Sequence, residues 1–440
     1  MDLASEIVSR YFSLENGGLC VGGLPVSEIV RQFGTPAFIY DHSILEARLS
    51  ALRDALPPSF QISYSVKANP AQEILRFFIG HNCGLEIASA GELEQALAAG
   101  CPAERIIFAG PGKTEAELEV ALRHRIKEIH VESTLEIERI HNLCRQRSWH
   151  ADIALRVNPS AEAQGGAMRM GGKPAPFGID EECIESVVAE VLKNPYLTFR
   201  GIHLFTGTQI LDHQVLITQY RKAIEIAGRI AWKFGCPIGT VDFGGGLGIP
   251  YFPGDKPLDL AALRADLDCL AAGSGEDKTF AGTEFMIEPG RFLVGESGVY
   301  VTRVNDIKVS RGKKFLIVDG GMNHHLAASG NLGQTIKRNY PVALLTRMSA
   351  PAAESVDVVG PLCTPLDVLA RNVHLPQAEV GDLFGVFQSG AYARSASPLA
   401  FLSHPAPPEI MVSGKSTFMI RRRGELSHYL QDQLRIQMAE

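Results

Sequence analysis

The stretch QISYSVKANPAQEILRFFIGHNCGLEIASAGELEQALAAG, residues 61–100, decides the fold. It alternates two short runs rich in β-branched and aromatic residues with two segments whose apolar residues recur at helical spacing. The same alternation continues along much of the chain. The β-rich runs are Gln61–Val66, Gly84–Ala88, Arg105–Ala109, Glu128–Val131, Asp152–Val157, Thr198–Phe205, Thr240–Phe243 and Glu284–Glu288.

Strands that alternate with helices predict a parallel sheet, and eight repeats predict a closed (β/α)8 barrel. The expected helices include Gly91–Ala99, Glu115–Arg123, Leu135–Arg145 and His213–Phe234. In such a barrel the carboxyl ends of the strands surround one pocket, so polar residues at those ends are candidates for catalysis. The candidates are Lys67, Glu86, Ser89, Arg156, Asn158, His203, Thr208, Gly244–Gly246, Glu288 and Arg291.

Length and composition limit the class of protein. The chain has 440 residues, more than the roughly 250 of an ordinary barrel, so a second domain is expected. A net charge of -7 opposes nonspecific nucleic-acid binding, which needs a basic surface. No apolar run reaches the roughly 20 residues of a membrane span, and the first residues lack the features of a secretion signal. The cysteines form no Cys-x-x-Cys pair, so neither a metal site nor a disulfide framework is expected. We therefore expect a cytoplasmic protein without nucleic-acid or membrane partners.

Beyond about residue 295 the pattern changes to β-rich segments without long amphipathic helices, which predicts an antiparallel β domain. The segments are Gly298–Val304, Lys314–Val318, Ser355–Val359 and Thr417–Arg421. We therefore expect a barrel over residues 36–294, and a β-sandwich or β-barrel-like domain built from residues 1–35 and 295–440. The long Gly-rich loop Ser160–Gly178 predicts either a lid over the pocket or a disordered segment.

Three features at the strand ends together describe a site for pyridoxal phosphate. Lys67, in YSVKANP, emerges from an apolar strand into the pocket, where desolvation favours Schiff-base chemistry. Gly244–Gly246 let backbone N–H groups approach a phosphate closely, and Gly290 with Arg291 could add donors. Glu288 would be costly to bury ionised without a cationic partner, and a pyridinium nitrogen is such a partner. Each feature alone also fits an ordinary structural role, but the combination indicates this cofactor.

The chain resembles the fold-type III pyridoxal-phosphate decarboxylases, the alanine-racemase-like barrel group that includes diaminopimelate, ornithine and arginine decarboxylases. The motifs that carry the resemblance are YSVKANP, EIASAGEL (86–93), GTQ (207–209), GGG, EPGR, VDGGM (318–322), GPLCTPLD (360–367) and SGAY (389–392). The resemblance implies a decarboxylase whose active sites are shared across a homodimer.

The resemblance also implies a role for each matching residue. Lys67 would bond to the cofactor aldehyde, Glu288 would pair with the ring nitrogen, and Cys363 of the partner subunit would return a proton to the substrate. The residues expected to hold the phosphate are Gly245, Gly246, Gly290, Arg291 and Tyr392, with Thr208 nearby. The residues expected on the substrate side are Arg156, His203, Arg338, Tyr340, Thr364 and Asp367.

Departures from the family pattern bear on the cofactor and the substrate. A family histidine that stacks on the cofactor ring is replaced by Phe205, which can stack but offers no proton. His203, two residues earlier, is either a satisfied core group or a substrate contact. The diamine decarboxylases keep an acid directly after the reactive cysteine, where this chain has Thr364, and a second acid aligns with Pro341. Although Asp367 remains, a buried ammonium would lack its full complement of carboxylates, so the substrate's distal end is expected not to be a free amine.

One smaller branch of the family shares these departures. GPLCTP, GIPYF (248–252) and DGGMNHH resemble the butirosin-pathway decarboxylase, which acts on a glutamyl unit carried by an acyl carrier protein, and the decarboxylases encoded with exosortase systems. We therefore expect a carrier-linked, glutamyl-like substrate, with meso-diaminopimelate or another free diamino acid as the alternative. A racemase and a catalytically silent regulatory homologue are alternatives of other classes. A strip of basic residues offers either a docking site for an acidic carrier or a solvated strand end. It comprises Arg311, Lys313, Lys314 and Arg421–Arg423.

Overall fold

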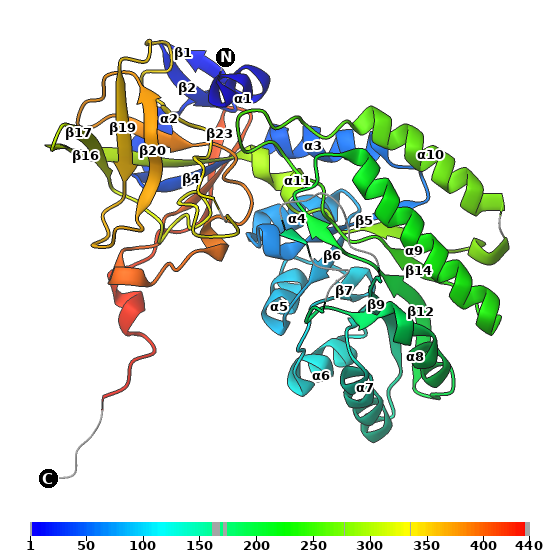
Figure 1. Cartoon of the computed structure of the whole chain (residues 1–440). Helices are drawn as coiled ribbons and strands as arrows, with labels where there is room; N and C mark the ends of the chain where they lie inside the picture. The colour runs from blue at the N-terminus through cyan, green and yellow to red at the C-terminus, as the bar shows by residue number, and fades with distance from the viewer. Residues whose placement is uncertain (1, 161–167, 170–173, 277, 335, 436–440) are drawn as a thin grey trace, which may run out of the picture. The chain divides into compact units, whose positions relative to one another are not determined.

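The structure, a computed structural model, describes residues 2–160, 168–169, 174–276, 278–334 and 336–435 (Figure 1). The chain divides into two compact units. Unit 1 comprises Met1–Ala47, Tyr251–Asp255 and Val294–Glu440, and unit 2 comprises Arg48–Pro250 and Lys256–Leu293. No helix among the described residues is long and apolar enough to cross a membrane.

Unit 2 is a closed barrel of parallel strands, as the sequence predicts. Around the barrel the strands are β5 (Phe60–Ser65), β6 (Gly84–Ile87), β7 (Ile106–Phe108), β8 (Glu128–Val131), β9 (Ala151–Asn158), β12 (Leu197–His203), β14 (Thr240–Asp242) and β15 (Glu284–Ile287). The pairing of β15 with β5 and of β8 with β9 closes the cylinder. Each strand coincides with a predicted β-rich run to within two residues at either end, so the predicted barrel is confirmed.

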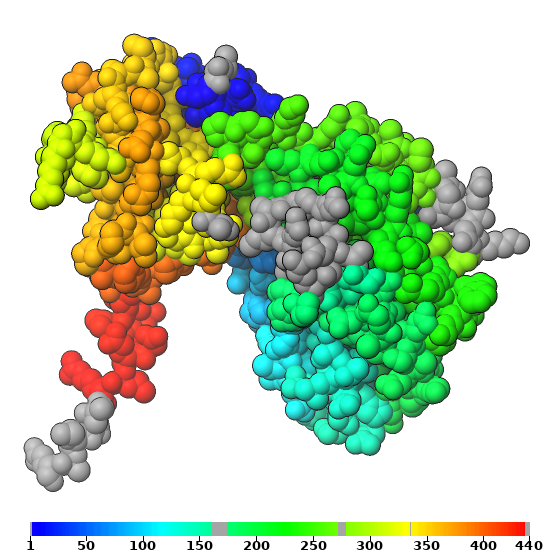
Figure 2. All heavy atoms as spheres, viewed as in Figure 1, coloured from blue at the N-terminus to red at the C-terminus, as the bar shows by residue number. Residues whose placement is uncertain are grey.

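Helices follow the strands and cover the barrel on its outside. They are α4 (Gln72–Gly80), α5 (Ala90–Ala98), α6 (Glu115–His124), α7 (Thr134–Arg147), α8 (Ile184–Val191), α9 (His213–Phe234) and α10 (Leu260–Glu276). Helices α9 and α10 lie side by side on the outer surface of the unit (Figures 1 and 2). Ser89, Thr114 and Ser133 cap α5, α6 and α7, because each hydroxyl accepts a hydrogen bond from a backbone N–H in the first helical turn.

The loop after β9 is only partly described. Met168–Arg169 forms a two-residue strand, β10, whose backbone pairs with β13 (Gly207–Thr208) after β12. Residues 161–167 and 170–173, on which most of the predicted lid falls, lie outside the described residues.

Unit 1 is built on a mixed sheet rather than on a purely antiparallel one. Its strands run in the order β20 (Val368–Leu375), β19 (Glu354–Val359), β17 (Lys313–Val318), β16 (Gly298–Ser310), β4 (Ala37–Asp41), β22 (Glu409–Ser413) and β23 (Ser416–Arg421). The pairs β17–β19 and β4–β22 are parallel, whereas the other neighbours in this order are antiparallel. Strand β21 (Leu383–Val386) pairs with β16, and β18 (Val342–Leu344) pairs with β21.

The N-terminal segment supplies part of the core of unit 1. Helices α1 (Leu3–Tyr11) and α2 (Val26–Phe33) pack apolar side chains into the same cluster as β4, β16 and β22. Strand β4 lies in the middle of the sheet, and all five of its residues are buried. Residues 36–47 therefore fall in unit 1, although the sequence analysis assigned them to the barrel. The run AFIYD has no alternation of buried and exposed positions that would distinguish a barrel strand from a central sheet strand.

Candidate active site

Lys67 and Glu86 form an ion pair at the carboxyl ends of the first two barrel strands. Lys67 lies in a short 3-10 turn, Val66–Ala68, directly after β5, and its Nζ lies 2.7 Å and 2.8 Å from the two carboxylate oxygens of Glu86. The parallel register places Ser65 opposite Glu86, and its hydroxyl donates to the same carboxylate. Burial raises the pKa of Glu86, but Lys67 and Ser65 outweigh burial and hold it below its ordinary value. Glu86 is therefore ionised and holds the ammonium group at the mouth of the barrel.

Three glycines after β14 and β15 occupy places where no side chain fits. A Cβ on Gly245 would lie 2.4 Å from the carbonyl oxygen of Glu288, and one on Gly246 would lie 2.8 Å from that of Gly207. A Cβ on Gly290 would lie 2.8 Å from a side chain of the 3-10 turn after β5. Gly246 also has a φ of +95°, which L side chains rarely adopt. This glycine cradle, Gly245, Gly246 and Gly290, lies where barrels commonly bind phosphate groups.

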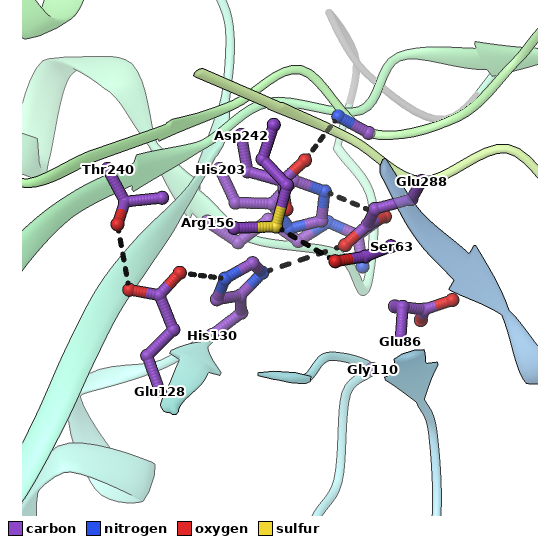
Figure 3. A network of polar contacts seen from close by, with 12 residues as sticks. Ser63, Glu86, Gly110, Glu128, His130, Arg156, His203, Thr240, Asp242 and Glu288 are labelled. Atoms are coloured by element: carbon purple, nitrogen blue, oxygen red, sulfur yellow. Dashed lines mark hydrogen bonds and ion pairs between the residues drawn. The ribbon is translucent and has the colours of Figure 1, made fainter. Parts of the chain in front are cut away.

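Buried charged side chains fill the barrel interior beside this cradle (Figure 3). Glu288, directly after β15, has its Oε2 3.5 Å from His203 Nε2 on β12 and its Oε1 3.8 Å from His130 Nδ1 on β8. The other ring nitrogen of His130 lies 3.2 Å from Oε1 of Glu128. Thr240, on β14, donates to Oε2 of Glu128 at 3.1 Å. The inward faces of three strands thus meet beneath Glu288.

Crowding of carboxylates shapes the electrostatics of this interior. Burial raises the pKa of Glu288 well above its ordinary value, and the charges of Asp242 and Glu86 add to the rise. Burial likewise raises the pKa of Asp242 to about 8, although Gly244 donates its backbone N–H to that carboxyl at 2.8 Å. Burial, with the charges of His130 and other cations, lowers the pKa of His203 well below its ordinary value. His203 is therefore neutral near pH 7.

The interior leaves polar atoms that a cofactor ring could use. Glu288 Oε1, Asp242 Oδ2 and both ring nitrogens of His203 are buried without a hydrogen-bond partner among the described residues. Unpaired buried acceptors are costly, and a protonated ring nitrogen would supply Glu288 with a donor. The residues present therefore fit pyridoxal phosphate: Glu288 would hold the ring nitrogen, the glycine cradle would hold the phosphate and Lys67 would hold the aldehyde.

Arg156 and Phe205 form the wall beside this interior. The guanidinium of Arg156 binds Glu132 at 2.6 Å, and Glu132 also accepts the backbone N–H of Gly178 at 3.1 Å. Arg156 is thus a buried ion-pair partner, which supports a structural role more than the predicted substrate contact. The half-buried side chain of Phe205 lies against Gly244, where an added Cβ would come within 2.8 Å of the Phe205 Cβ and of one ring carbon. His203 is buried, but both of its ring nitrogens lack a hydrogen-bond partner among the described residues, so it is not a satisfied core group and its contact with a substrate stays a prediction.

The candidate residues of unit 1 gather in two loops. Cys363 is exposed in the loop 360–367, and Asp367 is buried there, where it accepts backbone N–H bonds from Met322 at 2.6 Å and Leu362 at 2.9 Å. Both oxygens of Asp367 therefore hold the loop together, which supports a positioning role rather than the predicted substrate contact. Thr364 is partly exposed beside the thiol.

The second loop of unit 1 presents Arg338 and Tyr340. The guanidinium carbon of Arg338 lies 3.6 Å from the ring centre of Phe252, and Tyr340 packs 4.6 Å from the ring of Tyr251. Arg338 is exposed and Tyr340 is buried. Tyr392, predicted at the phosphate, has a left-handed φ of 52° in the turn after β21, a strained backbone often found at functional sites.

The structure thus brings one group of predicted residues together in unit 2 and another in unit 1. The first group comprises Lys67, Glu86, His203, Gly245, Gly246, Glu288, Gly290 and Arg291, and the second comprises Cys363, Thr364, Asp367, Arg338, Tyr340 and Tyr392. Sequence reasoning missed Glu128, His130, Glu132 and Asp242. The run EIHVE (128–132) did contain a signal, because its charged residues alternate and therefore share the inward face of the strand.

Comparisons with known proteins agree on one family. The sequence profile for the pyridoxal-binding domain of the pyridoxal-dependent decarboxylases matches residues 42–295. The L-glutamyl-[BtrI acyl-carrier protein] decarboxylase of Niallia circulans is 38% identical over 412 residues, which cover 93% of this chain and 96% of the relative. The diaminopimelate decarboxylase of Zymomonas mobilis is 33% identical over 432 residues, which cover 97% of this chain and 99% of the relative. The crystal structure of the Helicobacter pylori diaminopimelate decarboxylase with L-lysine has a TM-score of 0.83 at 29% identity, covering 92% and 98%.

Proposed function

The chain belongs to the pyridoxal-dependent decarboxylases, and from that premise we propose how its own residues carry the reaction. Membership confirms the expected enzyme class, a carboxy-lyase, and the expected cofactor, pyridoxal phosphate. It favours decarboxylation over the racemase and the silent homologue that the sequence alone left open.

The barrel residues hold the cofactor in this proposal. When bound, pyridoxal phosphate supplies an electron sink for the electron pair left behind by departing carbon dioxide. Lys67 anchors the aldehyde end, and Glu86 orients its amine through the 2.7 Å contact. Glu288 binds the protonated ring nitrogen, and Phe205 stacks on the ring. Gly245, Gly246, Gly290, Arg291 and Tyr392 bind the phosphate.

One observation carries this assignment. Strands β5 and β15 are parallel neighbours in the barrel, so the lysine that follows one and the carboxylate that follows the other lie at the same end of adjacent strands, and the charge of Lys67 acts on Glu288. The glycine cradle lies after β14 and β15, where the backbone packs too closely for any side chain at these positions. Pyridoxal phosphate needs three contacts: an amine for its aldehyde, a carboxylate for its ring nitrogen and a binding site for its phosphate.

A homodimer with shared sites is the arrangement we propose for the proton donor. Cys363 is exposed, and Leu366 in the same loop is 49% exposed. Asn331 donates to the carbonyl of Leu366 at 3.2 Å, which ties this loop to a neighbouring one where Leu332 is 39% and Ile336 is 80% exposed. Large exposed apolar side chains in the loop of the thiol and in the loop tied to it support a surface that a second copy of the chain covers. In that position Cys363 gives a proton to the substrate carbon in the partner's site.

We propose that the substrate is carried by a protein and ends in a neutral, glutamyl-like group. The relative that is 38% identical is named for such a substrate. In this chain Thr364 follows the cysteine, and the only acid of the loop, Asp367, has both oxygens occupied by backbone N–H groups. The loop therefore offers no available carboxylate to a distal ammonium, which a diamino acid would need.

The basic strip adds little support for carrier docking. Lys313 binds Asp357 at 2.7 Å, Lys314 binds Glu354 at 2.6 Å, and Arg421 is paired with Glu409. Arg423 donates to two backbone carbonyl oxygens, at 3.0 Å and 3.2 Å. Most of the strip is thus engaged within unit 1, and the proposed carrier substrate depends on the relative and the loop 360–367 instead.

A carbon dioxide release assay tests the substrate proposal. The holoenzyme is compared on glutamyl thioesters of acyl carrier proteins, free meso-diaminopimelate, lysine, ornithine and arginine. We expect turnover of the thioester and little turnover of free diamino acids. Efficient decarboxylation of meso-diaminopimelate, without activity on any thioester, would overturn the proposed substrate and leave the decarboxylase assignment intact.

A further inference from the structure

A chain of buried polar groups extends beneath the cofactor site, beyond the residues that the proposed function uses. Thr240 donates to Glu128 at 3.1 Å, Glu128 lies 3.2 Å from His130 Nε2, and His130 Nδ1 lies 3.8 Å from Glu288. The imidazole therefore stands between two carboxylates (Figure 3). Both carboxylate side chains and the ring are at most 5% exposed, so solvent cannot replace their contacts.

The ring contacts the two carboxylates in different ways. Its Nε2 is within hydrogen-bond distance of Glu128, whereas its Nδ1 lies 3.8 Å from Glu288, which is beyond a hydrogen bond and within reach of an ion pair. A neutral imidazole would serve Glu128 alone, whereas an imidazolium would also attract the charge of Glu288. Burial raises the pKa of Glu128, yet its hydrogen bond to His130 and the charge of that ring outweigh burial and bring it below its ordinary value.

We propose that His130 is a positioning residue that carries a positive charge between Glu128 and Glu288, and that Glu128 holds this charge in place. The effect falls on Glu288, which is kept ionised toward the cofactor's ring nitrogen. This inference rests on the proposed pairing of Glu288 with that nitrogen.

Glu288 needs a cation nearby because its surroundings oppose its charge. Burial and the charges of Asp242 and Glu86 raise the pKa of Glu288, while Lys67 and His130 act in the opposite direction. Lys67 is committed to Glu86 at 2.7 Å. His203 lies 3.5 Å from Glu288 but is neutral, because burial lowers its pKa well below its ordinary value. His130 is therefore the cation best placed to compensate Glu288.

Most of the charges around His130 are paired with one another. The ionisable groups around it, from every neighbouring strand, are Lys67, Glu86, Lys113, Glu128, Glu132, Glu136, Arg156, His203, Asp242 and Glu288. Three ion pairs account for six of them: Lys67 with Glu86, Lys113 with Glu136, and Arg156 with Glu132. Near pH 7 Asp242 is mostly protonated and His203 is neutral. Of the two carboxylates that remain, Glu128 has its pKa held below the ordinary value and Glu288 has its pKa raised well above it, so a cation matters most beside Glu288.

Binding to the apoprotein tests the inference without relying on activity. The probes are pyridoxal phosphate and its 1-deaza analogue, in which carbon replaces the ring nitrogen. We expect Glu128→Gln to weaken pyridoxal phosphate binding about tenfold, the equivalent of one pKa unit, and to leave binding of the analogue unchanged. His130→Asn should give a similar selective loss, and the double variant should lose no more than His130→Asn alone.

Two further variants keep the test decisive. Glu181→Gln is the matched control, because Glu181 is also a buried carboxylate but pairs with Lys222 at 3.0 Å outside this chain of groups, and it should change neither affinity. Thr240→Val removes only the hydrogen bond to Glu128 and replaces Glu128→Gln if that variant does not fold, with a smaller selective loss expected.

Other results would overturn the inference in distinguishable ways. An equal loss of both ligands in Glu128→Gln would make the residue merely structural. Wild-type protein that binds both ligands equally well would refute the pairing of Glu288 itself, and with it this part of the proposed function. A stoichiometric transition metal in purified apoprotein, absent from His130→Asn, would mean that the ring nitrogens are not donors.

Discussion

Gly245→Ala is the substitution whose effect the structure defines most closely. The added Cβ would lie 2.4 Å from the carbonyl oxygen of Glu288, a backbone atom that cannot rotate away. The φ of Gly245 is not left-handed, so the effect is steric and not a consequence of backbone strain. The loop after β14 must then move away from the end of β15, which displaces both the phosphate cradle and the carboxylate for the ring nitrogen.

The size of the effect follows from the cost of overpacking. Forcing an extra methyl group into a tight site costs about 1–3 kcal/mol. The apoprotein can relieve this cost by moving the loop, whereas the cofactor-bound form needs the loop in place, so most of the cost falls on binding. A change of about 1.4 kcal/mol is tenfold in affinity, so we expect cofactor affinity to fall by about 5- to 150-fold.

Titration of the apoprotein with pyridoxal phosphate, followed by absorbance, measures this loss. Gly80→Ala is the matched control, because Gly80 has open space at its Cβ position and no left-handed φ. It should bind the cofactor like the wild type. Wild-type affinity in Gly245→Ala, with a lowered melting temperature alone, would show that the glycine serves packing and not the cofactor.

Three further predictions follow from the same structure. Cys363→Ala should bind the cofactor normally and lose about 10²- to 10⁴-fold in product formation, as expected for loss of a general acid. Cys183→Ala, which changes another exposed cysteine, should keep full activity. A fully active Cys363→Ala would refute the role of this thiol as proton donor. The raised pKa of Asp242, about 8, means that this carboxyl binds more protons in the folded state than in the unfolded state between about pH 4 and 8, so its contribution to apoprotein stability should fall as pH rises through that range. Asp242→Asn should flatten this fall in melting temperature, and an unchanged slope would contradict the assignment. Thr364→Glu places an acid after the thiol and should raise carbon dioxide release from meso-diaminopimelate relative to release from glutamyl thioesters. If the ratio of the two rates does not change, Thr364 does not determine substrate specificity.

Much of the barrel is predictable because its strands are short apolar runs that end abruptly in polar residues. A parallel strand is buried on both faces, and the next helix begins with a capping residue such as Ser89 or Thr114, so each boundary leaves a mark in the sequence. Strand β4 is also a short buried run, but its partners β16 and β22 lie hundreds of residues away in the chain. Long-range pairing of that kind leaves no local pattern.

The residues of the candidate site also differ in whether a local sequence pattern could predict them. Lys67, Glu288 and the glycines follow strand ends, where a polar or glycine residue interrupts an apolar run and can be recognised as a candidate site residue. Glu128 and His130 lie within a strand instead, and their role depends on which residues meet them from β12, β14 and β15. The two backbone hydrogen bonds that Asp367 accepts depend on the path of two loops, so residue type alone could not predict them.

Borohydride reduction of the purified holoenzyme, followed by digestion and mass spectrometry, tests the central claim most directly. Reduction fixes pyridoxal phosphate to whichever amine holds its aldehyde. We predict a stoichiometric label on the peptide that contains Lys67, and none on the peptide that contains Lys113, the buried lysine of the barrel that is paired with Glu136. A label on another lysine, or protein that takes up the cofactor without any reducible bond at Lys67, would contradict the account.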